Sequence, residues 1–506
     1  MLKKNLLIWG VGGKNWMGGI SYIRNILFQL SLMKEHEQYN IYLCIDFDYL
    51  QEFDGLREKI DIFFIRQDND YEQLLKLCDQ YKIDIIFPLC YYAYAWMILE
   101  RSIFWIPDFQ EQHLPDNFTA KERKSRAINN NFIAKNHKAL VLSSHDSYND
   151  YKTQYADYTD NVFIVHFVSY IQNHLEKMHH DYEEEILKKF GINFEYIYIA
   201  NQFWKHKNHI VVLKALNELI NKKGMDIHLV CTGYMQSYDE SENTYIRMLR
   251  EYIADNSIEN NVHFLGLVER DEQLCIMKNA NLVIQPSLFE GWGCGVEDAK
   301  VLDKTMLLSD ISVHREQKNK KTILFSPNDE IELSCKIFEH YYSVPKYDLQ
   351  NGSKNTYQTA LLYEKELERV LASFDKYQGE SCLCIDRLEK LRENKITELF
   401  GDLDTKDIGI YGVGQHTGAL VKSCKRYLKD VKFTFFDSDP EKWGKDYCHT
   451  PIRSPQELMN CGLKRIVISS SMYEEEIYDS LAQYRDSIEI VKIYDCGNES
   501  PKLLWA

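Results

Sequence analysis

The chain has 506 residues, 45% of them apolar, and its 60 basic and 76 acidic side chains give a net charge of −16. At about 150 residues per domain, this length allows about three domains, each with its own core. The acidic balance excludes a surface built mainly for DNA or RNA, which needs an excess of positive charge.

The sequence has no run of the ~18 to 20 apolar residues that a membrane-spanning helix needs. The first apolar stretch, residues 6–9, ends at glycines without a cleavage site of small residues, so we do not expect secretion. We predict a cytoplasmic protein and leave open its peripheral attachment to the inner face of a membrane. The sequence leaves the oligomeric state undecided.

In the N-terminal third, short apolar runs alternate with amphipathic stretches. We predict strands at 6–9, 41–45, 62–65, 83–87, 139–142 and 162–165. Continuous apolar strands separated by helices are typical of a parallel sheet covered on both faces. The pattern predicts a first Rossmann-like domain over residues 1–180.

A second series of the same kind follows. We predict strands at 196–200, 227–231, 262–265, 282–285, 306–308 and 323–325. They define a second Rossmann-like domain over residues 190–345. Two doubly wound α/β domains in tandem enclose a cleft at the carboxyl ends of their strands, and we expect the chemistry there.

Residues 346–404 read as a helical connector, with helices near 356–374 and 385–400. A third Rossmann-like α/β domain is predicted over 405–506. After a strand at 408–411 it carries Gly412, Gly414 and Gly418, and a second strand ends at Asp437. Glycines between a strand and a helix let backbone N–H groups approach a phosphate, and an acid further on can bind ribose hydroxyls. A purely structural tight turn explains the same spacing, so both interpretations stay open.

The most informative stretch, residues 281–310, reads strand, loop, helix, strand. Its loop contains Glu290, Gly291 and Gly293, and the helix that follows has Glu297 and Asp298 in its first turn. Glycines there allow a ligand to contact the main chain, and the helix start offers N–H donors to phosphate or sugar oxygens. Carboxylates near a helix start also favour the helix dipole without any ligand.

This stretch resembles the retaining GT-B glycosyltransferases of family four, whose motif is Glu-Gly-Phe-Gly, four residues, then Glu-Ala. Glu290 matches the first glutamate, and Asp298, followed by Ala299, matches the second. In the family the first glutamate contacts the donor sugar and the second holds the ribose of the nucleotide. The resemblance therefore implies the donor-sugar role for Glu290, and the ribose role for Asp298 or the adjacent Glu297.

Three further positions belong to the donor side in the resemblance, and one of them departs from the family pattern. Lys207 matches a lysine that holds the donor phosphates, and Gln202 stands where the family often has an arginine. Val268 follows a strand in the segment that lies beside the nucleotide base in the family. A solvated loop charge and plain apolar packing are the structural alternatives for Lys207 and Val268.

In the first domain, Gly18 and Gly19 open a helix at the place where family members approach the donor phosphate and sugar. A dinucleotide-binding domain begins with a similar turn. Asp108 matches the aspartate of a His-Asp pair beneath the donor sugar. Pro107 stands at the histidine position, and we take His113 as the imidazole that fills the role, although a loop histidine is more often structural.

The resemblance implies transfer of a sugar, with retention, from a nucleoside-diphosphate sugar to a glycan or lipid-linked glycan in bacterial surface polysaccharide biosynthesis. It implies no cofactor and no metal. Two alternatives stay open: a dinucleotide-dependent oxidoreductase or epimerase acting on sugars, and a non-catalytic scaffold that binds a nucleotide sugar.

Overall fold

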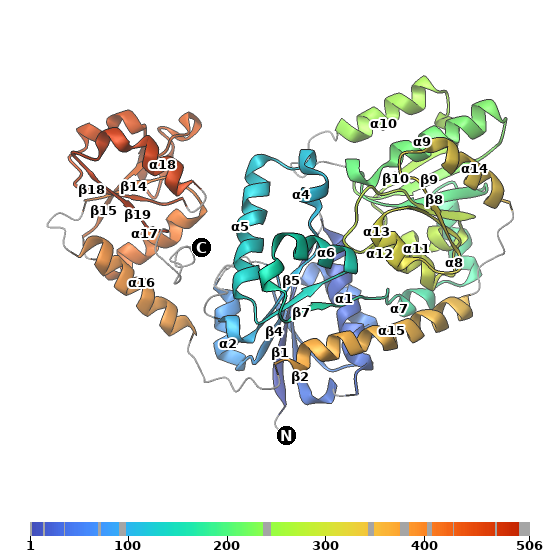
Figure 1. The fold of residues 1–506 in the computed structure, drawn as a ribbon, viewed down its shortest axis with the longest axis horizontal. Coiled ribbons are helices and arrows are strands. Elements are labelled where there is room, and N and C mark those ends of the chain that lie inside the picture. The colour runs from blue at the N-terminus through green and yellow to red at the C-terminus, as the bar shows by residue number, and fades with distance from the viewer. Residues whose placement is uncertain are drawn as a thin grey trace. The chain divides into compact units, whose positions relative to one another are not determined.

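A computed structural model gives the fold of the chain (Figure 1). It describes residues 3–13, 16–34, 36–68, 72–90, 98–235, 244–342, 349–374, 384–401, 407–428, 430–470 and 473–494. The chain divides into two compact units. The first consists of Met1–Gln67, Ile85–Cys90 and Ile103–Lys376, and the second of Asp68–Asp84, Tyr91–Ser102 and Tyr377–Ala506.

The first sheet has seven strands in the order β3-β2-β1-β4-β5-β6-β7, and its described pairings are parallel. The strands are β1 Lys4–Trp9, β2 Tyr39–Ile45, β3 Ile62–Arg66, β4 Ile85–Leu89, β5 Ser102–Ile106, β6 Ala139–Leu142 and β7 Val162–Ile164. Our predicted strands do not include β5, which ends just before Pro107 and Asp108. All five residues of β5 are buried, as a strand inside a covered parallel sheet requires.

Four helices of this first domain bear on the site: α1 Met17–Leu32, α4 Gln110–His113, α5 Ala120–Asn136 and α6 His145–Gln154. Helix α1 follows β1, and α6 follows β6, as in right-handed βαβ units. Most of α1 is buried, including the polar side chains of Arg24, Asn25 and Gln29. A helix that buries polar as well as apolar positions is covered on more than one side.

The second sheet has six parallel strands in the order β10-β9-β8-β11-β12-β13. They are β8 Tyr196–Ala200, β9 His228–Thr232, β10 Val262–Gly266, β11 Leu282–Gln285, β12 Met306–Ser309 and β13 Thr322–Phe325. The helices of this second domain are α7 Gln172–Leu175, α8 His180–Lys189, α9 His209–Asn217, α10 Thr244–Asp255, α11 Arg270–Asn279, α12 Cys294–Val301, α13 Ser312–Gln317 and α14 Glu330–His340. All six predicted strands are confirmed. The strand order reverses between β8 and β11, and ligands bind at such switch points.

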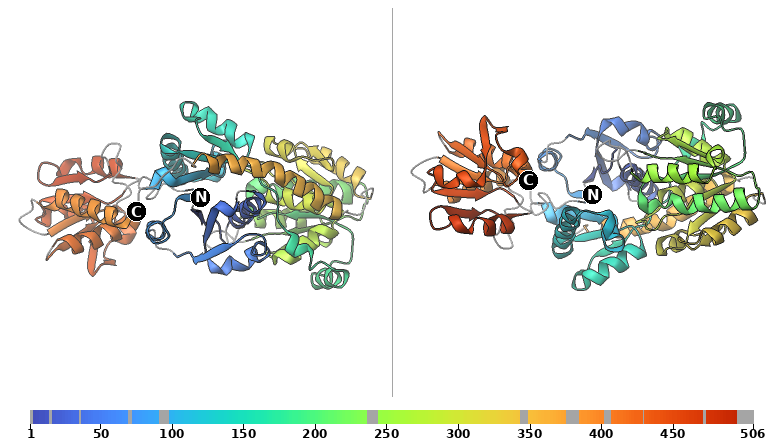
Figure 2. Two further views of the ribbon diagram at one scale, coloured as in Figure 1. Left: turned by 90° about the horizontal axis from the view of Figure 1, so that it is seen from below. Right: turned by 90° about the horizontal axis from the view of Figure 1, so that it is seen from above.

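Helix α15, Leu349–Ala372, returns from the second domain to the first (orange in Figures 1 and 2). It packs against both α1 and α12. One apolar cluster joins the two domains, since it contains Ile8 of β1, Trp292 of the second domain and Leu367 of α15. The first unit is therefore held together by a shared core as well as by surface contacts.

The second unit contains a third sheet in the order β16-β17-β15-β14-β18-β19. Its strands are β14 Asp407–Tyr411, β15 Lys432–Phe436, β16 Asp446–Tyr447, β17 Thr450–Arg453, β18 Arg465–Ile468 and β19 Glu489–Lys492, and its helices are α2 Gln73–Tyr81, α16 Cys384–Phe400, α17 Gln415–Tyr427 and α18 Glu474–Ser480. Helix α2 packs on α16, and Arg392 Nη1 lies 2.7 Å from Glu72 Oε1. In the described ranges, no helix is both long and apolar enough to span a bilayer.

Candidate active site

Glu290 lies at the switch point of the second sheet, in the loop between β11 and α12. Its side chain is 9% exposed, and its Oε1 accepts hydrogen bonds from Lys207 Nζ (2.6 Å), Gln285 Nε2 (2.9 Å) and Ser287 Oγ (2.6 Å). Burial alone would raise the pKa of Glu290, but the Lys207 ammonium and the Ser287 hydroxyl lower it to about 2. The carboxylate is therefore charged at neutral pH.

Lys207 comes from the short 3-10 turn after β8, on the other side of the same switch point. The two loops are tied together, because Leu288 N donates to His206 O (2.8 Å) and Asn208 Nδ2 donates to Pro286 O (3.1 Å). Burial and the neighbouring Lys207 charge lower the pKa of His206 to about 3, so His206 is neutral. The Lys207 ammonium lies 2.6 Å from Glu290 Oε1, and a site for a diphosphate needs such a cationic donor.

A buried histidine that the sequence did not point to lies behind Glu290. His314 of α13 is fully buried, and its Nδ1 lies 2.9 Å from Ser309 O. Ser309 Oγ in turn donates to Ser287 O (2.5 Å). Burial lowers the pKa of His314, so a neutral ring supports the Ser287–Glu290 loop from beneath. Only the folded chain brings β12 and α13 under this loop.

The Glu290 loop also touches the first domain. A Cβ atom on Gly291 would lie 2.6 Å from Pro107 O and 3.0 Å from Asp108 Cβ, so only glycine fits at this position. Asp108 Oδ1 accepts from Gln110 N (3.1 Å) and lies 3.4 Å from Arg126 Nη1. The predicted Glu290 and Asp108 therefore lie on facing loops.

His113 reaches the same region from α4. Its ring centroid lies 5.0 Å from that of Phe289, the residue before Glu290, and its Nε2 lies 2.8 Å from Asp150 Oδ2. The imidazole is 44% exposed. His113 thus stands beside the Glu290 loop with a carboxylate orienting its ring, an arrangement that suits proton transfer as well as packing.

Glu297 and Asp298 follow in α12, and both side chains are buried. Glu297 Oε1 accepts from Gln317 Nε2 (2.8 Å) and Lys300 Nζ (2.7 Å). Asp298 Oδ1 accepts from Arg270 Nη2 (2.6 Å) and from the Ser169 hydroxyl. Burial alone would raise the pKa of Asp298, but Arg270 holds it below its usual value. The two carboxylates face different surroundings.

Arg24 of α1 completes the Asp298 cluster from the first domain. It is 1% exposed, and its Nη1 donates to Glu52 Oε2 (2.7 Å). Burial and the nearby Arg270 lower the pKa of Arg24, and the carboxylates of Glu52 and Asp298 partly offset this effect. Its Nε and Nη2, like Nε of Arg270, are buried without a hydrogen-bond partner among the described residues. Buried guanidinium N–H groups without partners are costly unless a ligand or water satisfies them.

The remaining predicted donor-side residues are spread around this region. Gly19 packs so closely on Gly12 that a Cβ atom would lie 2.7 Å from Gly12 Cα, which explains the glycine at the start of α1 beside Gly18. Gln202 Oε1 accepts from Trp204 Nε1 (2.6 Å), within its own loop. Val268 is half-buried between β10 and α11. Gly293 N donates to Gln317 Oε1 (3.2 Å).

The glycine loop of the third sheet has a structural explanation. Asp437 Oδ2 accepts from Val413 N (2.8 Å) and Lys442 Nζ (3.0 Å), and its Oδ1 accepts from Asp439 N (3.0 Å). Gly412 has φ +87, which accounts for the glycine there. Gly414 lies next to Thr417, whose hydroxyl accepts from Gly414 N (3.0 Å), and Gly418 follows in α17. Asp437 thus fixes the loop that carries Gly412 and Gly414, which favours the interpretation of this loop as a structural tight turn.

In the described ranges, no group of three or more His, Cys, Asp or Glu side chains is placed to hold an ion.

Comparison with known proteins supports the fold and the second domain. Residues 183–341 match the family model described as glycosyl transferases group 1. No curated protein sequence matches the chain.

Three solved structures illustrate the likeness. A glycosyltransferase from Rickettsia africae is 14% identical, with 74% of this chain and 100% of that chain covered and a TM-score of 0.53. Anabaena Alr3699/HepE, in complex with UDP and glucose, is 14% identical, with 73% and 100% covered and a TM-score of 0.53. WaaG, a glycosyltransferase involved in lipopolysaccharide biosynthesis, is 12% identical, with 72% and 98% covered and a TM-score of 0.50. The chain therefore carries a glycosyl transferases group 1 domain within a GT-B fold, followed by a third sheet at its C-terminal end.

Proposed function

We propose that this protein transfers a sugar, with retention, from a nucleoside-diphosphate sugar to a glycan or lipid-linked glycan in surface polysaccharide biosynthesis. The observation that carries the proposal is the buried pair of Glu290 and Lys207, joined at 2.6 Å across the switch point of the second sheet. A fixed cation and a fixed carboxylate are the groups needed to hold a leaving diphosphate and the hydroxyls of a donor sugar.

In the proposed reaction the donor diphosphate binds Lys207, and Glu290 accepts hydrogen bonds from hydroxyls of the donor sugar. The lysine stabilises the negative charge that grows on the leaving diphosphate as the sugar–phosphate bond breaks. The acceptor hydroxyl attacks from the face that the diphosphate leaves, which retains the configuration, and its proton passes to the departing phosphate oxygen. Asp108 and His113 line the sugar from the first domain.

We assign the ribose of the donor to Asp298 rather than Glu297. Asp298 bonds Arg270, which follows the Val268 segment at the start of α11, whereas Glu297 bonds Gln317 of α13. The free N–H groups of Arg24 and Arg270 suit ribose or base oxygens beside Asp298. In this proposal the guanidinium groups of Arg24 and Arg270 serve the nucleotide, in a chain that has Gln202 at the usual arginine position.

The acceptor side of the proposal draws on an aromatic stack in the first domain. Trp16 is 38% exposed, and its ring lies nearly parallel to that of Trp105 with centroids 5.9 Å apart. Trp105 in turn stacks on Tyr22 at 3.7 Å. A rigid, partly exposed aromatic face next to Gly18 suits the apolar face of a sugar ring. WaaG and its role in lipopolysaccharide biosynthesis add support for a glycan acceptor.

A dinucleotide-binding domain uses an acid after its second strand to hold the ribose of the cofactor, and Asp46 stands at that place after β2. Asp46 instead accepts from Asp48 N (3.1 Å) and caps the turn that follows, so the dinucleotide alternative has less support. The decisive experiment incubates the purified protein with UDP-glucose and other nucleotide sugars, with and without EDTA, and measures the free nucleotide released. UDP-glucose comes first because the Anabaena neighbour was solved with UDP and glucose. Donor-specific release that survives EDTA is expected, whereas loss restored by magnesium contradicts metal-independent transfer.

A further inference from the structure

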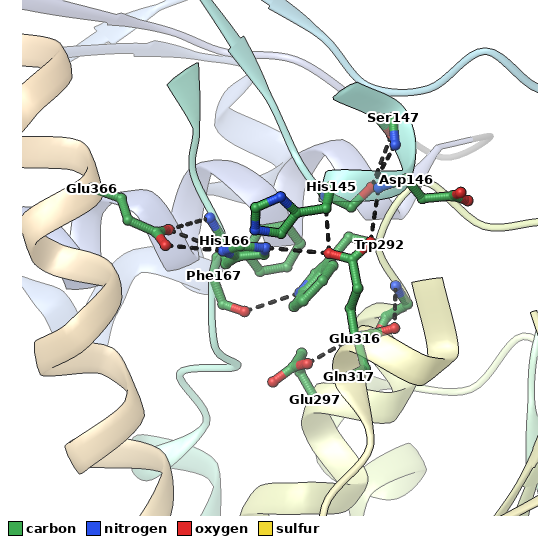
Figure 3. Close-up of polar contacts among 12 residues, drawn as sticks. His145, Asp146, Ser147, His166, Phe167, Trp292, Glu297, Glu316, Gln317 and Glu366 are labelled. Atoms are coloured by element: carbon green, nitrogen blue, oxygen red, sulfur yellow. Dashed lines mark hydrogen bonds and ion pairs between the residues drawn. The ribbon is translucent and has the colours of Figure 1, made fainter. Parts of the chain in front are cut away.

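His166 occupies the junction of three elements of the first unit (Figure 3). It follows β7 at the carboxyl end of the first sheet, and its side chain is 9% exposed. Its Nδ1 lies 3.1 Å from both carboxylate oxygens of Glu366 on α15, and its backbone N–H donates to Glu366 Oε2 (2.8 Å). Its Nε2 lies 3.5 Å from Glu316 Oε2 on α13. One ring therefore stands between two carboxylates from different helices.

Glu316 also caps a helix of the first domain. Its Oε2 accepts from His145 N (2.9 Å), and its Oε1 accepts from Asp146 N (2.8 Å), at the start of α6. Free N–H groups at a helix start attract a carboxylate. The cap comes from the second domain, so Glu316 joins the second domain to the first at two places, α6 and His166.

The same junction also contacts the segment that follows Glu290, and Figure 3 shows the bond between Trp292 and Phe167. Trp292, two residues after Glu290, donates from Nε1 to Phe167 O (3.0 Å), and its ring lies 4.8 Å from that of His166. Gln317, next to Glu316, accepts from Gly293 N and donates from Nε2 to Gly293 O (3.1 Å). The loop is thus fixed through His166 and Phe167 on one side and through α13 on the other.

We propose that His166 is a positioning residue for the reaction: by joining Glu316 of α13 and Glu366 of α15, it fixes Trp292 and so the loop that carries Glu290. The inference rests on the proposed function, because Glu290 matters only if the protein acts on a sugar donor. Without a positive charge between them, the two carboxylates would repel each other across the junction. The positive charge of His166 therefore helps to hold α13 and α15 in place, in addition to the apolar packing of α15 on α1 and α12.

Burial alone would lower the pKa of His166, but its bonds to Glu316 and Glu366 raise it to about 9. Since this lies above the ordinary value of 6.5, the junction contributes its full stability below pH 6.5 and loses it as the pH rises through about 9. The described titratable groups next to His166 are Glu316, Glu366, Tyr363 and His145. Asp146 interacts with Glu316, and Glu297 interacts with Tyr363.

The test compares His166→Gln with His145→Gln in the full-length protein. The first substitution removes the charge at the junction, whereas His145 meets Glu316 only through its backbone N–H, which the second substitution keeps. With UDP-glucose as donor, His166→Gln should lower kcat for UDP release about tenfold, because a displaced catalytic group costs rate. Its Kd for UDP should stay within about twofold of wild type, since Lys207 and Asp298 are untouched. His145→Gln should match wild type in both.

The pH profile separates positioning from a general loss of structure. The kcat of wild type and of His145→Gln should fall as the pH rises through about 9, the pKa of His166, and His166→Gln should lack that component. Glu316→Gln, a milder change, should show a smaller loss of kcat in the same direction. The inference is overturned if the wild type is active and His166→Gln has the same kcat and the same pH profile as the wild type.

A wild type without turnover on any donor contradicts the proposed function instead, and thermal unfolding then tests the junction alone. The Tm of His166→Gln should lie below that of wild type near pH 6.5, and the gap should narrow as the pH passes about 9. A gap that does not change with pH overturns the role of the charged imidazole.

Discussion

Glu297 and Asp298 are adjacent in α12, yet they bind partners in different parts of the first unit. Glu297 contacts Gln317 of α13, and Asp298 contacts Arg270 of α11 and Ser169 of the segment between the domains. Successive helix positions point about 100° apart, so neighbouring side chains cannot share one partner. The motif alone does not separate the two acids, but their surroundings do.

This difference predicts distinct effects on nucleotide binding. Asp298→Asn should weaken UDP binding by about tenfold or more, because a charged hydrogen bond to the ribose is lost. Glu297→Gln, the matched change one residue earlier, should stay within about twofold of wild type. Isothermal titration calorimetry with UDP measures both. Equal losses, or a larger loss for Glu297→Gln, would show that Asp298 only balances the buried arginines.

The Glu290–Lys207 pair predicts a loss of catalysis. Glu290→Gln should lower the rate of nucleotide release by about 100-fold, as removal of a group that stabilises the transition state does. Lys207→Ala should lose activity and also stability, by about 3–5 kcal/mol, because Glu290 would remain buried without its cation. Lys205→Ala, an exposed lysine in the same turn, is the control and should change neither. Near-normal turnover by Glu290→Gln would refute the site.

The contact between Gly291 and Pro107 predicts a steric effect. A methyl group at Gly291 would meet Pro107 O at 2.6 Å, whereas one at Gly295 would lie 3.7 Å from Ala200 O, an ordinary contact. Gly291→Ala should therefore push the Glu290 loop from the first domain, reducing kcat and Tm, and Gly295→Ala should resemble wild type. Steady-state kinetics and thermal unfolding of the two variants check this, and equal behaviour would mean that the loop adapts freely.

The stack of Trp16 on Trp105 predicts an effect on the acceptor alone. Trp16→Ala should raise the KM for a glycan acceptor several-fold and leave the Kd for UDP unchanged, because it removes apolar contact with a sugar face. Trp443→Ala, at a residue of the second unit that is 37% exposed, controls for the loss of a surface indole. An unchanged acceptor KM would exclude Trp16 as a sugar platform.

The division into units predicts the outcome of a truncation. A chain ending at residue 376 should still bind UDP, because the described partners of Glu290 and Asp298 lie in the first unit. It should unfold at a lower temperature, since α2 loses its packing on α16 and Glu72 loses Arg392. Full-length Arg392→Ala isolates the ion pair. A folded truncated chain that fails to bind UDP would contradict this assignment, and an unfolded product would make residues 377–506 part of the core.

The sequence by itself determined most strands of the first two sheets and the order in which the three sheets follow along the chain. The apolar runs at 139–142, 196–200 and 282–285 are strands with those bounds, because burial on both faces demands continuous apolar residues. The glycine-flanked Glu290 could be found in the same way, since its loop connects a strand to a helix within one short segment. The run at 102–106 is also a buried strand with mostly apolar residues, but our predicted strands do not include it.

Only the tertiary structure decided which polar groups meet. Arg24 pairs with Glu52, Glu316 caps a helix that begins 171 residues earlier, and His166 meets Glu366 across 200 residues. The sequence around a charged residue in a helix is the same whether or not that residue has a distant partner, so the partner cannot be predicted from it. Its partner is set by how the two domains and α15 pack, because that packing places side chains together in a low-dielectric interior where their charges interact strongly.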